Sequence, residues 1–193
     1  MKAVIFDLDG TLVDVPYEWP KIRRKLGVGE KPILSHLASL SGPERGRKWK
    51  LLEKIEAQAT RKAILKEGVA RFLDFLDKNS IRKALVTNNS RKNVDYLLRK
   101  FKLKFECVIS RESGLWKPSA EPLLAALKKL GVEKEEACVV GDSHFDAKAA
   151  AEAGVKRIFL LRRQGIDYSS LSSEVVDSFV ELEEKIKALM AEE

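Results

Sequence analysis

Cysteine is scarce in this sequence, which limits the cross-links and soft-metal sites that the chain can form. Only two of its 193 residues are cysteines, Cys107 and Cys138. Each lies in a short apolar run, FECVIS and EACVV, of the kind that forms a buried strand. We therefore expect two buried free thiols, rather than a disulfide or a metal-binding pair.

Long hydrophobic runs are also missing. No apolar run approaches the ~18 residues that a membrane-spanning helix needs. The first residues, MKAVIFDLDG, form a short apolar run that ends in acids, which is not the pattern of a signal peptide. These absences predict a cytoplasmic protein without a membrane partner. The hydrophobic fraction of 45% suffices for a core, and the length fits one domain with a small insertion.

Charge is abundant, and it is unevenly distributed. The chain has 36 basic and 29 acidic residues, and its many Lys, Arg and Glu are compatible with the ion-pair-rich surface of a thermophilic protein. Residues 16–66 hold 13 basic and 5 acidic residues, a net charge of +8, so this segment accounts for the whole +7 of the chain and the remainder is about neutral. Such a segment attracts phosphorylated metabolites, nucleic acid or membrane surfaces, or it is simply a solvated helical face.

Short apolar runs rich in Val, Ile and Phe alternate with amphipathic stretches of helical period. The alternation predicts a parallel sheet covered by helices on both faces. The expected strands are 2–6, 83–87, 105–110, 137–141 and 157–161. The expected helices are 69–79, 91–101, 120–131 and 146–154, with Gly131 and Gly154 at helix ends. A last short strand or loop and a final helix follow.

Residues 15–66 break this rhythm. The segment has no convincing strand and is typical of a few helices separated by glycine and proline at 27–32 and 42–46. We therefore expect a small helical insertion after the first strand, after which the sheet resumes.

Polar side chains follow four of the expected strands. Asp7 and Asp9 end the first strand, Thr87 and Asn88 the second, and Lys117 follows the third. Asp142 and Asp146 follow the fourth. Because ligands of open parallel sheets bind at the carboxyl ends of the strands, we expect these groups to converge.

Clustered carboxylates repel one another, so this site requires a cation. Oxygen ligands favour a hard ion such as Mg²⁺, which commonly accompanies phosphate. Thr87 and Lys117 can bind phosphate oxygens, and the backbone N–H groups around Gly10 and Asn88 can add more. One carboxylate could attack phosphorus, and a second could protonate the leaving oxygen and then activate water.

Four motifs in this order resemble those of the haloacid dehalogenase superfamily. They are FDLDGT at 6–11, VTN at 86–88, KP at 117–118 and GDSHFD at 141–146. The resemblance implies a Rossmann-like, doubly wound α/β core formed by residues 1–14 and 67–193. The insertion at 15–66 is similar in position to the small all-helical C1 cap of this superfamily.

The resemblance also implies a role for each motif residue. Asp7 would be the nucleophile and a Mg²⁺ ligand, and Asp9 the general acid and base, with its backbone carbonyl on the metal. Thr87, with Asn88 and Gly10, would bind the phosphoryl group, and Lys117 would balance its charge. Asp142 would bind the metal directly, and Asp146 directly or through its neighbours.

Each of these residues also has an ordinary structural interpretation. Asp9 and Gly10 could form a turn, Thr87 could merely end a strand, and Lys117 could be a surface lysine. Asp142 could cap the following helix, and Asp146 could pair with Lys148. Ser143 is expected to serve at the N-terminus of that helix.

The second aspartate separates the reactions of this superfamily. The dehalogenase branch has no acid at the position of Asp9, and the phosphonatase branch has alanine there, so Asp9 favours phosphoryl transfer. We therefore expect a Mg²⁺-dependent phosphatase that hydrolyses a small phosphorylated metabolite. One alternative is a phosphomutase of the β-phosphoglucomutase type. Another is a basic module that binds nucleic acid or protein, although no nucleic-acid motif is present.

Overall fold

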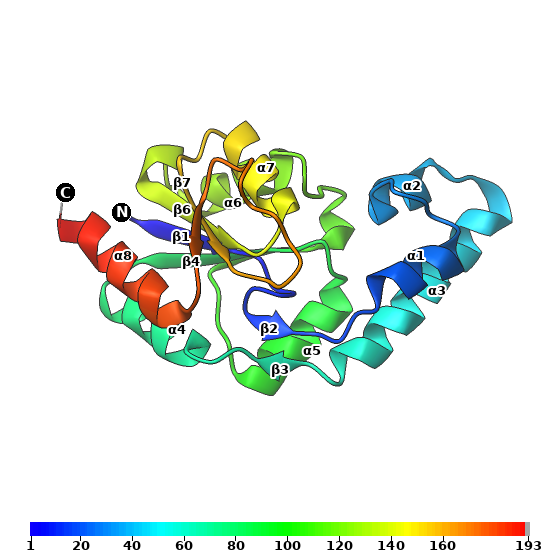
Figure 1. The fold of residues 1–193 in the computed structure, drawn as a ribbon, viewed down its shortest axis with the longest axis horizontal. Helices are drawn as coiled ribbons and strands as arrows, with labels where there is room; N and C mark the ends of the chain where they lie inside the picture. The colour runs from blue at the N-terminus through cyan, green and yellow to red at the C-terminus, as the bar shows by residue number, and fades with distance from the viewer. Residues whose placement is uncertain (192–193) are drawn as a thin grey trace. The chain divides into compact units, whose positions relative to one another are not determined.

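A computed structural model describes residues 1–191 and shows a six-stranded sheet whose paired strands are all parallel (Figure 1). Its strands are β1 (Ala3–Phe6), β4 (Arg82–Val86), β5 (Cys107–Ile109), β6 (Ala137–Gly141), β7 (Arg157–Leu161) and β8 (Glu174–Val176). The parallel sheet and its helices confirm the predicted α/β class. Five of the strands were expected, and β8 is the short strand left open near the C-terminus.

The strand order β5-β4-β1-β6-β7-β8 places β1 inside the sheet. Phe6 at its end pairs with Leu85 of β4 on one side and with Val140 of β6 on the other. The chain therefore leaves β1 toward one side and returns on the other. A crevice at the carboxyl ends of the strands is expected at such a reversal, and Asp7 follows β1 at this point.

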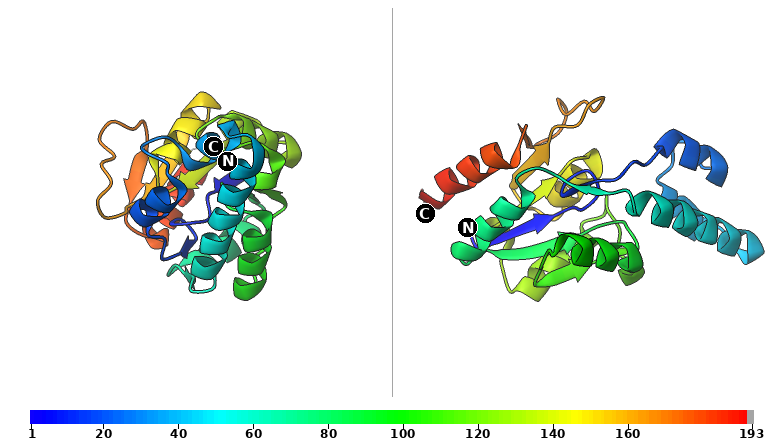
Figure 2. Two further views of the ribbon diagram at one scale, coloured as in Figure 1. Left: turned by 90° about the vertical axis from the view of Figure 1, so that its right-hand side faces the viewer. Right: turned by 90° about the horizontal axis from the view of Figure 1, so that it is seen from below.

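Helices cover the two faces of the sheet. On one face, Ala3 and Ile5 pack in a core with residues of α6 (Glu121–Leu130) and α7 (His144–Glu152). On the other, Phe6 contacts Phe72 of α4 (Val69–Lys78), which contacts Phe179 of α8 (Phe179–Ala191). Figures 1 and 2 show α4 and α8 side by side. Alternate β1 side chains thus point to opposite faces, as a strand requires.

The remaining elements of this sheet unit connect the strands. They are α5 (Arg91–Phe101) and two short 3₁₀ turns at Arg111–Ser113 and Lys134–Glu136. The helices match the expected ranges to within two residues. Gly131 ends α6 with the left-handed backbone predicted for it.

The chain forms two compact units, one of Met1–Asp14 with the residues from Leu65 onward and one of Val15–Ile64. The second unit contains α1 (Trp19–Leu26), α2 (Ile33–Ser39) and α3 (Gly42–Thr60), and both shorter helices contact α3. Its assignment as a cap, and the boundaries 15–66, stay predictions.

One expectation for this segment is wrong, because it does contain a short strand. β3 (Ile64–Leu65) pairs with β2 (Val13–Asp14), so the two ends of the insertion lie side by side. Lys66 continues this contact, since its N–H donates to Leu12 O and its ammonium pairs with Asp14. A strand of two residues is too short to show the alternation of apolar and polar side chains, so the sequence pattern could not predict it.

The structure can be compared with the expectations drawn from the few cysteines and from the missing long hydrophobic runs. Cys107 and Cys138 are both buried free thiols, which confirms that expectation. Within residues 1–191, no helix is both long and apolar enough to cross a membrane. The cytoplasmic compartment stays a prediction.

Candidate active site

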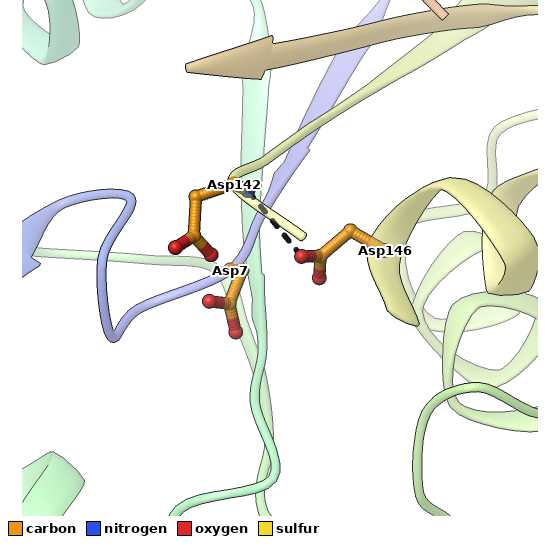
Figure 3. Close-up of side chains that lie close together, drawn as sticks. All are labelled: Asp7, Asp142 and Asp146. Atoms are coloured by element: carbon orange, nitrogen blue, oxygen red, sulfur yellow. Dashed lines mark hydrogen bonds between the residues drawn. The ribbon is translucent and has the colours of Figure 1, made fainter. Parts of the chain in front are cut away.

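Three carboxylates meet at the carboxyl edge of the sheet. Asp7 follows β1, Asp142 follows β6, and Asp146 lies in the first turn of α7 (Figure 3). Each offers an oxygen, and these three oxygens lie within 4.8 Å of one another. They derive from two neighbouring strands and the helix that follows one of them, so the backbone itself creates the cluster.

Lys117 connects two of these carboxylates. Its ammonium nitrogen lies 2.6 Å from Asp7 Oδ1 and 2.5 Å from Asp146 Oδ1, and all three side chains are buried. A buried ammonium is tolerated only with such partners. Lys117 is therefore part of the cluster and not the surface lysine of the alternative interpretation.

Asp146 has a second set of contacts that fixes its orientation. Its Oδ2 accepts hydrogen bonds from the Ser143 hydroxyl at 2.6 Å and from the Ser143 N–H at 3.1 Å. Ser143 and Asp146 form the capping box of α7, which confirms the helix-terminal role expected for Ser143. The alternative partner of Asp146 is not adopted, because Lys148 pairs with Glu152.

Asp142 is held by residues that follow β7, the strand next to β6. Arg163, in the loop after β7, donates from Nη1 to Asp142 Oδ2 at 3.0 Å. The buried Tyr168 hydroxyl donates to Asp142 O at 2.9 Å and accepts the Arg163 N–H at 3.0 Å. The loop after β7 is thereby fastened to the end of β6.

Asp9 is held by the strand on the opposite side of β1. Its Oδ2 accepts a hydrogen bond from Asn89 Nδ2 at 2.8 Å. Gly10, next in the chain, has a φ of +91°, and a Cβ there would lie 2.1 Å from Asp142 Oδ2. Only glycine therefore fits this close approach of the Asp9–Gly10 turn to the Asp142 carboxylate.

Thr87 and Asn88 lie at the end of β4. Thr87 Oγ1 accepts the Asn89 N–H at 3.1 Å. Asn88 binds the main chain of Lys117 at two points, since Oδ1 accepts its N–H at 3.0 Å and Nδ2 donates to its carbonyl at 2.9 Å. The side chain of Asn88 thus positions the Lys117 segment, and its carbonyl accepts from Arg111 Nε at 3.0 Å, which leaves its main-chain N–H for a ligand.

Three charged groups of the site have shifted pKa values. Burial raises the pKa of the Asp7 carboxyl; the nearby Lys117 ammonium opposes this, while Asp146 and Asp142 add to it. Burial also raises the pKa of Asp142 to about 6, and the Asp146 carboxylate acts in the same direction. For Lys117, burial alone would lower the pKa, but the Asp146 and Asp7 carboxylates outweigh it and raise it.

The structure brings four of the predicted residues into one cluster, namely Asp7, Lys117, Asp142 and Asp146. Gly10 touches this cluster, and Asn88 supports it. Asp9 and Thr87 are connected to each other through Asn89. The roles assigned to these residues are chemical, and they stay predictions.

Two side chains of the site, those of Arg163 and Tyr168, were not predicted from the sequence. Asn89 was expected at the end of the second strand, but its side chain was given no role. Arg163 follows the fifth expected strand, so the strand-end rule would have found it had it been extended beyond four strands. Tyr168 carries no sequence signal, because its contact depends on how the loop folds.

Comparisons with known proteins agree with this geometry. The family model for haloacid dehalogenase-like hydrolases matches residues 1–154. An uncharacterized hydrolase of Saccharomyces cerevisiae is 30% identical over 189 residues, covering 94% of this chain and 87% of that protein. A phosphorylated carbohydrates phosphatase of Thermotoga maritima is 30% identical over 184 residues, covering 82% of this chain and 84% of that protein.

A solved structure shows the same fold. A hydrolase from Pseudomonas syringae superposes with a TM-score of 0.80 at 21% identity, covering 97% of this chain and 99% of that one. The match of the family model spans the first, second, third and fourth motifs, which carry the residues of the site. The chain is therefore an enzyme that belongs to the haloacid dehalogenase-like hydrolase family, as its motifs predicted.

Proposed function

We propose that this hydrolase is a Mg²⁺-dependent phosphatase that acts on a small phosphorylated metabolite through an aspartyl-phosphate on Asp7. The observation that carries the proposal is the position of Asp7, a buried carboxylate beside Lys117 and within 4.8 Å of two further acids. Its relatives include a protein named as a phosphatase of phosphorylated carbohydrates. Phosphoryl transfer relies mainly on positioning and charge stabilisation, which such a cluster supplies.

The carboxylate cluster fits a magnesium ion. Asp7 and Asp146 pair with Lys117, and Asp142 lies beside them. The pKa values of Asp7 and Asp142 are raised, and carboxylate oxygens are hard ligands of the kind that Mg²⁺ prefers. Asp7, Asp142 and the Asp9 carbonyl would hold the ion, which when bound would neutralise charge on a phosphate. Asp146 already uses both oxygens, on Lys117 and Ser143, which favours an orienting role for it.

A phosphoryl group would be bound by residues on either side of Asp7. Thr87 uses its oxygen to accept the Asn89 N–H, so its hydroxyl proton remains for a phosphate oxygen. Lys117 would add a positive charge, and the main-chain N–H of Asn88 would add a donor, whereas the Gly10 N–H already donates to Val13 O at 2.7 Å. The Asn88 side chain would act indirectly, by fixing the segment that carries Lys117.

The reaction would proceed in two balanced steps. In the first, an Asp7 oxygen forms a bond to phosphorus, the bond to the leaving oxygen breaks, and Asp9 gives that oxygen its proton. In the second, Asp9 takes a proton from water as the water oxygen bonds to phosphorus. The bond from phosphorus to Asp7 then breaks, and inorganic phosphate leaves.

The test is phosphate release from a panel of phosphorylated metabolites, with and without Mg²⁺, with p-nitrophenyl phosphate as the generic ester. We expect Mg²⁺-dependent release that Asp7→Asn abolishes. Asp74→Asn, which changes an exposed aspartate on α4, is the matched control and should retain activity.

Three results would contradict the proposal. Full activity of Asp7→Asn would exclude the aspartyl-phosphate. Isomerisation of a phosphorylated sugar without net phosphate release would favour the phosphomutase alternative. A chain without any esterase activity that binds random oligonucleotides in a salt-sensitive way would instead support the basic binding module.

A further inference from the structure

Asn89 is a buried asparagine at the end of β4 to which no motif role has been given. It is 4% exposed, and its Nδ2 donates to Asp9 Oδ2 at 2.8 Å. This hydrogen bond joins residues 80 positions apart in the chain. It ties the second motif segment to the aspartate proposed as the general acid and base.

The orientation of the Asn89 amide is fixed by its other partners. Its Oδ1 accepts the Ser90 N–H at 2.7 Å and Asn93 Nδ2 at 3.0 Å. A backbone N–H can only donate, so the atom that faces Ser90 must be the amide oxygen. The amide nitrogen must therefore face Asp9, where it can only donate.

The backbone of Asn89 is held as firmly as its side chain. Its N–H donates to Thr87 Oγ1 at 3.1 Å, and its carbonyl accepts the Arg111 N–H at 3.0 Å. Asn93 belongs to the first turn of α5, so the amide is anchored between a strand end and a helix. Supports on rigid elements of this kind hold a reacting group within the tolerance that catalysis needs.

We propose that Asn89 is a positioning residue for Asp9, a role that rests on the proposed function and extends it. The amide donates to one carboxyl oxygen and fixes the side-chain rotamer. Oδ1, the oxygen that does not accept from Asn89, is then the one that delivers the proton to the leaving group. Asn93 acts one step further away, by fixing the Asn89 amide.

This role predicts a dependence on the leaving group, which a structural asparagine would not produce. An alkoxide leaves only with a proton from the general acid, whereas p-nitrophenolate leaves without one. A misplaced Asp9 should therefore slow the formation of the aspartyl-phosphate from alkyl phosphates and spare its formation from the aryl ester. This first step is reported by kcat/KM, whereas kcat also contains the hydrolysis of the aspartyl-phosphate, which needs Asp9 as a base for both esters. Loss of general stability or of phosphate binding would affect both esters alike.

The experiment compares Asn89→Ala, Asn93→Ala and Asn79→Ala with the full-length wild-type chain on β-glycerophosphate and p-nitrophenyl phosphate at saturating Mg²⁺. For Asn89→Ala we expect kcat/KM to fall about 30-fold on β-glycerophosphate and less than about threefold on the aryl ester, because misplacing a catalytic group costs up to about 100-fold. Asn93→Ala should show the same selectivity with a smaller effect and serves if Asn89→Ala does not fold.

Asn79→Ala is the matched control. The exposed Asn79 amide donates to the Phe75 carbonyl of α4, and we expect wild-type kcat/KM on both esters. Equal losses of kcat/KM on the two esters for Asn89→Ala and Asn93→Ala would overturn the proposal, as would unchanged kcat/KM on both. Asp9→Asn, measured in parallel, separates the two hypotheses. If Asp9→Asn shows the leaving-group dependence and the Asn89 variant does not, only the positioning role fails. If Asp9→Asn lacks it, the general-acid role fails as well.

Discussion

At the scale of single residues, the site depends on a few close contacts that leave no space for a larger side chain. Gly10 is the clearest, since its positive φ and its contact with Asp142 both exclude a side chain. Sequence analysis placed Gly10 at a phosphate-binding turn. It could not show that the residue facing Gly10 would be a carboxylate from another strand.

We predict that Gly10→Ala lowers kcat about 100-fold or more, because the new Cβ would displace the Asp142 carboxylate. It should also reduce the rise in Tm that Mg²⁺ causes. Gly46→Ala is the matched control, since a Cβ there meets nothing within 4 Å inside α3. The control should keep its kcat and gain a little stability, about 0.5–1 kcal/mol. Wild-type kcat in Gly10→Ala would contradict the close contact.

The pKa of Asp142 makes a second prediction at this scale. The folded protein keeps the Asp142 proton up to about pH 6 because the carboxyl is buried, whereas an unfolded chain releases it near pH 4. Without added metal, the free energy of unfolding should therefore fall as pH rises through this window. Mg²⁺ held by the Asp142 carboxylate, as proposed, would compete with this proton, so its affinity should rise as pH increases toward 7.

Thermal unfolding at pH 5, 6 and 7.5, with and without Mg²⁺, measures both effects. We expect the stabilisation by Mg²⁺ to be small at pH 5 and fully developed at pH 7.5. Removal of the metal with a chelator at pH 7.5 should reverse it. A shift in Tm that is the same at all three values would show that Asp142 does not take part.

At the scale of elements, the loops after the strands hold the site together. Tyr168 fastens the loop after β7 to the carbonyl of Asp142. The hydroxyl is buried, so its loss leaves the Asp142 carbonyl and the Arg163 N–H without this partner. Unsatisfied buried groups cost about 1–3 kcal/mol.

We therefore predict that Tyr168→Phe lowers the free energy of unfolding by about 1–3 kcal/mol. Urea titration measures this value. Tyr96→Phe, which removes the hydroxyl of an exposed tyrosine on α5, should change it by less than about 0.5 kcal/mol. Equal stabilities of the two variants would mean that the loop does not depend on the hydroxyl.

The burial of Cys107 in β5 and of Cys138 in β6 predicts that both thiols are unreactive in the folded protein. Burial raises the pKa of the Cys138 thiol to about 12 and also raises that of Cys107. Because thiolates are the reactive form, neither cysteine should react with a thiol reagent in the folded protein. Both should react at once in urea. Rapid labelling of the folded chain would contradict the burial of β5 or β6.

At the scale of the whole molecule, the insertion begins and ends at paired strands. β2 and β3 hold residues 14 and 64 close together, and the sheet unit has its own hydrophobic core. We predict that the chain folds when residues 15–64 are replaced by a short Gly/Asn linker. We propose that the insertion, the predicted cap, chooses the substrate, so the shortened chain should lose its selectivity among phosphate esters.

Circular dichroism and thermal unfolding would measure the folding of this shortened chain, and kcat/KM over the panel of esters would measure its selectivity. We expect a folded protein that Mg²⁺ still stabilises. An unfolded chain would contradict the independence of the sheet unit. An unchanged ranking of substrates would contradict the role of the insertion.

The sequence alone determined the fold class, the helical insertion and the residues at four strand ends. It could do so because hydrophobic period is a local property, and because the carboxyl ends of parallel strands always converge. The tertiary structure decided the rest, namely the order of strands around β1, the pairing of β2 with β3, and the contacts of Asn89 with Asp9 and of Arg163 with Asp142. These contacts join residues 80 and 21 positions apart, so they depend on distances between strands that no local pattern records.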